Sequence, residues 1–177
     1  MGYYSETEKV VELIDPKYLQ GKVLDIGCGD HKVTLEAIGI DGRDRPGVDF
    51  ILKDEISIYM LGIIYPELED ANTVFSSHCV EHLENDTSAL LSWSALIKPN
   101  GYLILYLPDG RKYSNEGNME HMRDYTYDNF MFYFKRVFCG EGKNFKGENL
   151  PAIFKVLESG EDFREDCYSF YVIAEKL

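Results

Sequence analysis

The stretch that decides the fold is "KVLDIGCGDH", residues 22–31. Its short apolar run is closed by glycine, a pattern typical of a buried strand. Gly27 and Gly29 leave the backbone free to adopt a positive φ and to approach a ligand closely. Asp25, two residues before the first glycine, can order the loop by accepting its N–H groups or can meet a cationic ligand, and it would repel a pyrophosphate. The stretch therefore predicts a strand followed by a ligand-binding turn.

Similar apolar runs recur along the chain and alternate with helical patterns. Further strands are expected at residues 37–41, 47–52, 72–77, 102–108, 152–158 and 167–176. Helices are expected at 5–14, 87–97 and 126–138, with N-caps at Ser5, at Asn85 or Asp86, and at Thr126, and a turn is expected at 98–101. The order favours an α/β fold with a mostly parallel sheet, helices on both faces and a late antiparallel hairpin. Ligands of such sheets bind at the carboxyl ends of the strands.

Length and charge narrow the class of protein. We expect one domain over residues 1–177. The 18 basic and 31 acidic residues give a net charge of −13, and no basic stripe is present, so long nucleic acid is a poor substrate. The sequence contains no apolar run of about 18 residues, so no membrane span is expected. The N-terminus lacks a signal-peptide pattern and the four cysteines lack metal or disulfide spacing, so we expect a reduced, cytoplasmic protein.

A second motif, "HCVEH" at residues 78–82, raises a different possibility. His78, Glu81 and His82 match the H-x-x-E-H pattern of inverted zinc peptidases. On a helix the two histidines would share a face and hold a metal, with Glu81 as a base. A zinc hydrolase is therefore an alternative.

Two further carboxylates follow predicted strands. Asp41 is placed to bind a ribose diol, and Asp54 to meet an adenine amino group. Each pattern also occurs in ordinary structure, Asp41 as a turn residue and Asp54 as a helix cap.

Taken together, the motifs identify a family. The ordered series "VLDIGCGD", "AIGIDGR", "GVDFILKD", "VFSSHCVEHL", "LIKPNGYLILYLPD" and "EHMRDYT" closely resembles class I S-adenosylmethionine-dependent methyltransferases. The match runs from about residue 20 to about residue 135, and it looks most like a subgroup of small enzymes with "EHL" after the fourth strand. The resemblance implies a Rossmann-like sheet, S-adenosylmethionine as cofactor and S-adenosylhomocysteine as product.

The resemblance also implies site residues. The matching cofactor-binding positions are Asp25, Gly27, Cys28, Gly29, Asp41, Gly42, Asp54, Ser77 and His78. In that family the segment around His78 begins at the end of the fourth strand, lines the cofactor pocket and binds no metal, and His82 begins the next helix. We therefore expect no metal site.

The chain departs from the family next to the glycine-rich loop. His31 stands where many relatives have a third glycine. Only eight residues, Asp30 to Ala37, separate Gly29 from "IGID", so the usual helix of a dozen residues cannot fit. We expect a loop or a single turn there, with this first helix shortened or absent.

Methyl transfer is an in-line displacement that depends mainly on alignment. A base is needed only for a hydroxyl or a protonated amine, and the candidates are His121, His78 and Asp109. The alternative for His121 is a purely structural role, in which it ties the loop 109–125 to the core. The polar loop 108–125 is expected to cover the acceptor, with Arg111 or Arg123 available for an anionic one.

The sequence does not name the acceptor, and a small molecule or a saccharide is expected. Two other functions stay open besides the zinc hydrolase. One is a cofactor-binding protein without turnover, which the short loop and His31 favour. The other is a nicotinamide oxidoreductase, which is disfavoured by Asp25 and by Lys32 at the last glycine position of the dinucleotide fingerprint.

Overall fold

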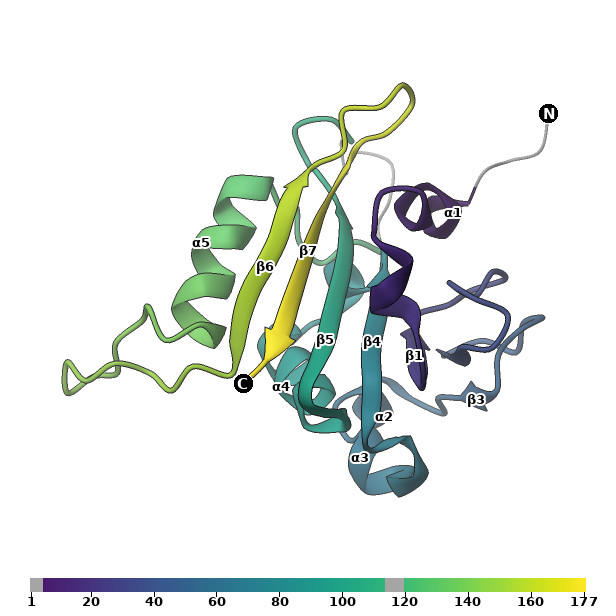
Figure 1. The fold of residues 1–177 in the computed structure, drawn as a ribbon, viewed down its shortest axis with the longest axis horizontal. Helices are drawn as coiled ribbons and strands as arrows, with labels where there is room; N and C mark the ends of the chain where they lie inside the picture. Colours follow the sequence, from purple (N-terminus) through teal and green to yellow (C-terminus); the bar gives the residue numbers. More distant parts are fainter. Residues whose placement is uncertain (1–4, 114–119) are drawn as a thin grey trace.

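The computed structural model describes residues 5–113 and 120–177 (Figure 1). Their strands form a seven-stranded sheet in the order β3-β2-β1-β4-β5-β7-β6. The strands are β1 (Val23–Ile26), β2 (Ile38–Asp41), β3 (Phe50–Ile51), β4 (Ala71–Ser77), β5 (Ile97–Pro108), β6 (Phe154–Glu161) and β7 (Ser169–Lys176). All neighbouring pairs from β3 to β5 are parallel, and β7 runs antiparallel to both β5 and β6. The mostly parallel sheet and the late hairpin are therefore confirmed.

Short helices connect the strands. They are α1 (Glu6–Val11), α2 (Glu55–Ile58), α3 (Leu61–Ile64), α4 (Asp86–Leu96) and α5 (Tyr127–Phe138), with the single turns η1 (Pro16–Leu19), η2 (Pro66–Leu68) and η3 (Val80–His82). Ser5 and Thr126 cap α1 and α5 through capping boxes, and Asn85 caps α4, as the sequence predicts. None of the described helices is long and apolar enough to cross a membrane.

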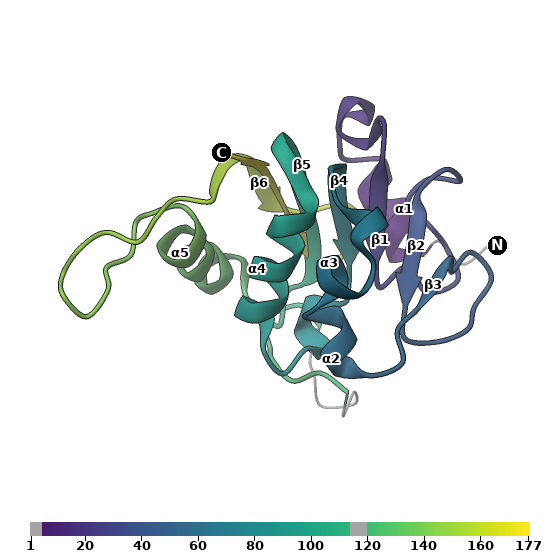
Figure 2. The ribbon, with the colours of Figure 1, turned by 90° about the horizontal axis from the view of Figure 1, so that it is seen from below.

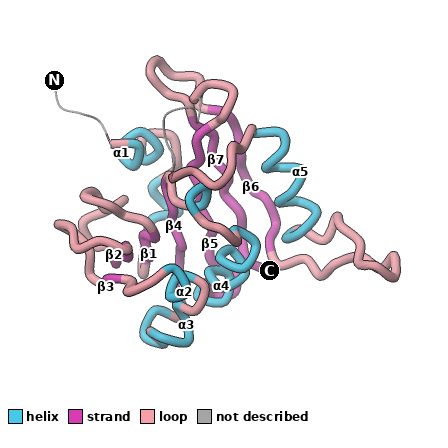
Figure 3. The backbone as a smooth tube through the Cα atoms, turned by 180° about the vertical axis from the view of Figure 1, so that it is seen from behind, coloured by secondary structure: helices cyan, strands magenta, loops and turns pink. Residues whose placement is uncertain are grey.

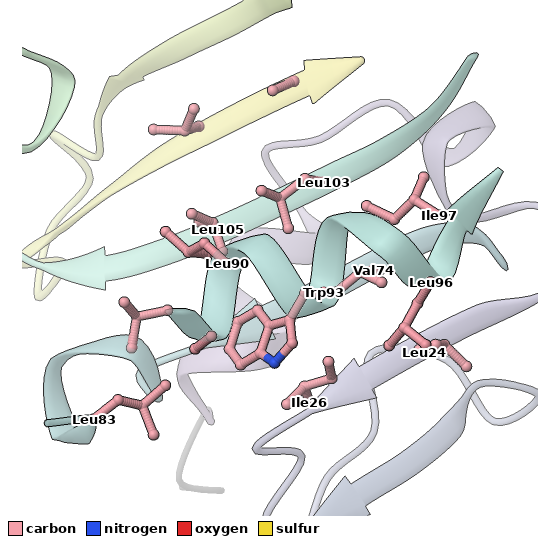
Figure 4. Close-up of a cluster of buried hydrophobic side chains, with 14 of the residues drawn as sticks. Leu24, Ile26, Val74, Leu83, Leu90, Trp93, Leu96, Ile97, Leu103 and Leu105 are labelled. Carbon is pink, nitrogen blue, oxygen red and sulfur yellow. The ribbon is translucent and has the colours of Figure 1, made fainter. Parts of the chain in front are cut away.

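The larger core lies between the sheet and α4 (Figure 4). Trp93 is fully buried there, and its indole N–H donates to the carbonyl of Ile58 at 3.2 Å. Figures 2 and 3 show α2, α3 and α4 on this side of the sheet. Phenylalanines extend the core under α5, where Phe130, Phe134 and Phe138 are fully buried. This face carries most of the hydrophobic burial that stabilises the sheet.

The opposite face has a smaller cluster and a thinner cover. Val10, Ile14 and Tyr18, from the segment that includes α1 and η1, pack on side chains of the central strands. Between β1 and β2 the described chain forms only turns and bends, so the expected absence of the usual helix is confirmed. Val33 and Ala37 from this loop are buried against the same cluster. The side chains of Val33 and Ala37 thus contribute the hydrophobic packing that a helix would otherwise supply on this face.

Two local expectations need correction. The turn expected at 98–101 is part of β5, which begins at Ile97 directly after α4. The turn-forming residues act inside the strand instead: Asn100 has a φ of 61°, and the register with β4 shifts between Ala71 and Thr73. His82 does not begin the following helix, because it ends the single turn η3 and α4 starts at Asp86.

Candidate functional site

A cavity of about 570 Å³ opens where β1, β2 and β4 end. Its lining residues are Gly27, Gly29, Asp30, Asp41, Arg43, Arg45, His78, Cys79, His82, Glu120 and Met122. They come from the segments after three neighbouring strands and from the loop after β5 (Figure 1). The volume falls within the range of small-molecule sites. Its position at the carboxyl ends of parallel strands is where open α/β sheets bind ligands.

The glycine-rich loop turns sharply against β4. Gly27 has a φ of +79°, and a Cβ at this position would lie 2.6 Å from the Cβ of Cys79. Its N–H donates to the carbonyl of Ile40 at 2.8 Å, which joins the loop to β2. Gly29 has a φ of +55°, and a Cβ there would meet no atom within 4 Å. The first glycine is therefore required by packing, whereas the second leaves open space beside the cavity.

Asp25 lies beneath this loop and is 1% exposed. Its Oδ2 accepts a hydrogen bond from the N–H of Val33 at 2.6 Å, and its buried Oδ1 has no partner among the described residues. Burial raises the pKa of Asp25 to about 7, although the hydrogen bond from Val33 opposes this. Of the two roles expected for this carboxylate, the observed contact is the ordering of the loop.

Asp41 joins the two loops on this side of the cavity. Its Oδ2 accepts the N–H of Gly29 at 2.9 Å, and its Oδ1 accepts the N–H of Arg43 at 2.9 Å. Arg43 and Arg45 also line the cavity, and Arg45 forms an ion pair with Asp30 at 3.3 Å. The sequence reasoning missed both arginines, although their place directly after a strand was a usable signal.

The other residues expected near a cofactor lie in different settings. Asp54 caps α2 by accepting the N–H and the hydroxyl of Ser57 at 2.9 and 2.8 Å, and these bonds lower its pKa. It does not line the cavity, and neither does Gly42, where a Cβ would meet no atom within 4 Å. Ser77 is buried with no partner for its hydroxyl among the described residues. Cys28 is buried, which raises its pKa to about 12 and keeps the thiol protonated.

His78 stands at the end of β4 in a left-handed conformation with a φ of 50°. Its side chain is 18% exposed and lines the cavity. Nε2 lies 2.9 Å from the hydroxyl of Ser169, and Nδ1 lies 3.6 Å from Oε1 of Glu81. Burial lowers the pKa of His78 to about 3, so the imidazole is neutral near pH 7 and is a weak base there.

Glu81 is completely buried, and neither carboxylate oxygen has a hydrogen-bond partner in the described structure. Burial raises its pKa to about 8. Nε2 of His82 lies 3.9 Å from Glu81 Oε1, and the ring of His121 meets the ring of His82 edge to face at 4.6 Å. Burial and the neighbouring His82 also lower the pKa of His121. The structure therefore brings His121 together with the "HCVEH" segment.

Asp109 lies apart from this group and does not line the cavity. Its Oδ1 accepts from the N–H and Nε of Arg111 at 3.0 and 2.9 Å, and its Oδ2 accepts the N–H of Tyr127 at 3.2 Å. Burial alone would raise the pKa of Asp109, but these hydrogen bonds lower it. Oδ1 is held by Arg111 of the same loop, and Oδ2 ties the loop to the first residue of α5, so the geometry gives Asp109 a structural position.

The expected arginines of the polar loop are engaged within the protein. Arg111 pairs with Asp109 and Glu161, and Arg123 donates to the carbonyls of Leu83 and Glu84 at 3.0 and 2.8 Å. Residues 114–119, the centre of the loop expected to cover the acceptor, lie outside the described residues.

A family model described as "Methyltransferase domain" matches residues 6–137. No curated protein matches the chain.

Solved structures share the fold at low sequence identity. An S-adenosylmethionine-dependent methyltransferase from Mesorhizobium loti has a TM-score of 0.63 and 10% identity, over 97% of this chain and 98% of the other. The 1,6-didemethyltoxoflavin-N1-methyltransferase of Burkholderia thailandensis, solved with its acceptor and S-adenosylhomocysteine, has a TM-score of 0.61 and 13% identity, over 97% and 78%. The magnesium protoporphyrin IX methyltransferase of Synechocystis PCC 6803, solved with S-adenosylmethionine, has a TM-score of 0.57 and 15% identity, over 97% and 78%. These likenesses establish the fold class.

Proposed function

The chain belongs to the methyltransferase domain family, and we propose that it transfers the methyl group of S-adenosylmethionine to a small-molecule or saccharide acceptor, on oxygen or nitrogen. The observation that carries this proposal is the cavity at the ends of β1, β2 and β4, where Asp41 is bonded to the glycine-rich loop. A volume of about 570 Å³ suits one small cofactor with part of an acceptor.

Three groups of this chain would hold the cofactor. The backbone of Gly27, Cys28 and Gly29 faces its methionine part, since side chains are absent at both glycines. Asp41 accepts from the ribose hydroxyls, because each carboxylate oxygen keeps a free lone pair beside its present bond. Ser77 supplies a buried hydroxyl that lacks a partner in the described structure. The bound cofactor supplies an activated methyl group on a cationic sulfonium.

The residues of the chain contribute mainly alignment. Carboxylates at Asp30, Asp41 and Glu120 favour a cationic ligand in this cavity. His78 lines the wall at the end of β4, and His121 lies behind His82 in the same group. Neither histidine is a strong candidate base, because the pKa of His78 is lowered to about 3, and His121, whose pKa is also lowered, does not line the cavity.

The acceptor class rests on charge and size. A chain with a net charge of −13 does not favour a polyanion, and the two arginines that line the cavity, Arg43 and Arg45, form ion pairs with Glu120 and Asp30 at 3.6 and 3.3 Å. The four cysteines are free thiols, which suits the reducing cytoplasm.

Calorimetric titration with S-adenosylhomocysteine tests the cofactor and its site. Wild type should bind saturably, and Asp41→Ala should weaken binding by about tenfold or more, because a charged acceptor for the ribose hydroxyls is lost. Asp44→Ala is the matched control, since this exposed carboxylate does not line the cavity. Absence of binding in folded wild type would contradict the proposal.

Turnover needs its own measurement. Wild type should transfer more radiolabelled methyl to the small-molecule fraction of a cell extract than the Asp41→Ala variant does. Binding without transfer to any fraction would instead support the alternative of a cofactor-binding protein without turnover.

A further inference from the structure

The starting point is a buried carboxylate that the fold does not satisfy. Glu81 is 0% exposed, and its two oxygens have no hydrogen-bond partner among the described residues. The nearest nitrogens, on His78 and His82, are 3.6 and 3.9 Å away, which is longer than a hydrogen bond. A buried carboxyl group, protonated or ionised, normally has a hydrogen-bond partner or coordinates a metal, because burying a polar group alone is costly. Glu81 therefore needs a partner that the polypeptide does not supply.

His82 is oriented to present a lone pair beside this carboxylate. Its Nδ1 lies 3.1 Å from the carbonyl oxygen of Glu120. A carbonyl only accepts, so Nδ1 carries the proton, and Nε2, which lies toward Glu81, keeps its lone pair. A backbone carbonyl that fixes the ring in this way is the usual support of a metal-binding histidine.

His121 completes the group from a distant part of the chain. Its ring lies 4.6 Å from that of His82, at an interplanar angle of 84°. One potential ligand atom from each of Glu81, His82 and His121 lies within 4.8 Å of the others. Metal bonds of about 2.0–2.2 Å place tetrahedral ligand atoms about 3.3–3.6 Å apart. Small rotations of the side chains reach that spacing.

We propose that Glu81, His82 and His121 bind a divalent transition-metal ion, with Nδ1 of His78 as a neighbouring fourth donor. Ser169 lies 2.9 Å from Nε2 of His78, and its hydroxyl can accept that proton, which leaves Nδ1 free toward Glu81. Imidazoles with one carboxylate suit Zn²⁺, Co²⁺ or Mn²⁺ better than Mg²⁺ or Ca²⁺. The "HCVEH" motif is thus explained by a site that includes a histidine from another segment, contrary to the expectation of no metal.

The position of the ion suggests its use. His78 and His82 also line the cavity, so a ligand of the ion would lie at the edge of that cavity. An ion there lowers the pKa of a bound acceptor hydroxyl and orients its oxygen. This role rests on the proposed methyl transfer, whereas the binding of the metal does not.

The test is titration of the chelator-treated full chain with Zn²⁺, followed by calorimetry, with Co²⁺ absorption as a second probe of the ligands. Wild type should bind one ion, and the Co²⁺ spectrum should show nitrogen ligation. Glu81→Gln and His121→Ala should each weaken binding by about 100-fold. His31→Ala is the matched control, since this exposed histidine lies outside the group, and it should bind as wild type does.

Glu81→Gln keeps the shape of the side chain and removes the cost of ionising a buried carboxyl group, so the metal-free variant should melt at or above the wild-type temperature above pH 8. This measurement separates a lost ligand from a lost fold. Absence of Zn²⁺ binding in wild type, or binding that survives both variants, would overturn the proposal. S-adenosylhomocysteine is titrated in parallel: if it fails to bind while Zn²⁺ binds, the proposed methyl transfer fails and the metal site stands.

Discussion

The two sides of the cavity handle a buried carboxylate differently. On the side of β1 and β2, Asp25 holds the N–H of Val33, and Asp41 holds Gly29 and Arg43. On the side of β4, Glu81 is buried with neither oxygen hydrogen-bonded in the described structure. On the first side each carboxylate accepts at least one hydrogen bond that orders a loop, although Oδ1 of Asp25 has no partner among the described residues. On the second side both oxygens of Glu81 are left without one. We infer that the first side is built for geometry and the second for a further ligand.

The largest expected effect is on the side of β1 and β2, where Asp25 should make the free energy of unfolding depend on pH. Burial raises the pKa of Asp25 to about 7 in the folded state, above the value of about 3.9 in an unfolded chain. The folded state therefore holds this proton more tightly, and stability that is present below about pH 4 is lost as the pH rises through 7. At about 1.4 kcal/mol for each pKa unit, the loss is on the order of 4 kcal/mol.

Asp25→Asn should abolish this part of the loss, because its amide oxygen can still accept from Val33 without carrying charge. Urea unfolding of both proteins at several values between pH 4 and 8 measures the difference, since all other titrating groups are shared. Parallel stability curves would mean that Asp25 is ionised at no cost and that the two sides of the cavity do not differ in this respect.

A smaller effect is the difference in the free energy of unfolding between alanine substitutions of the two glycines on the same side. Gly27→Ala meets both a left-handed φ and a contact of 2.6 Å with Cys79, so strain and overpacking add. Each costs about 1–3 kcal/mol, and the free energy of unfolding should fall by roughly 3 kcal/mol. Gly29→Ala has only the left-handed φ and should cost about 1–2 kcal/mol.

Denaturant unfolding of both variants checks this ratio. The pair also tests the link between the two sides, because Cys79 follows directly after His78. Equal losses would show that the contact between Gly27 and Cys79 relaxes freely and that the sides are not coupled through it.

The sequence predicts features that depend on local spacing, and it does not predict features that depend on contacts between distant segments. The strand before Gly27, the capping box at Ser5 and the N-cap at Thr126 depend on local spacing, and the sequence predicts all three correctly. The helices α2 and α3 have four residues each, too few for a hydrophobic period, and were not predicted.

The group around Glu81 depends on contacts between distant segments. The motif supplies His78, Glu81 and His82, but the approach of His121 follows from the path of the chain after β5, which no local pattern encodes. Whether Glu81 finds a partner is likewise a property of the packed fold. Asp109 shows the converse, because its neighbour Arg111 captures it only once the loop has its folded shape.

The smallest effect concerns Asp54, which lies on neither side of the cavity. The sequence places it near an adenine, whereas the structure uses it as the N-cap of α2. If Asp54 acts only as the N-cap of α2, Asp54→Ala should lower Tm by a few degrees. It should leave the affinity for S-adenosylhomocysteine within about threefold of wild type. Ser57→Ala removes the hydroxyl that bonds Asp54 but keeps the carboxylate and its backbone bond. If the carboxylate meets an adenine amino group, Asp54→Ala weakens calorimetric binding by about tenfold or more while Ser57→Ala does not. In that case the cofactor extends from the cavity to α2, and the side of β1 and β2 is longer than the cavity alone indicates.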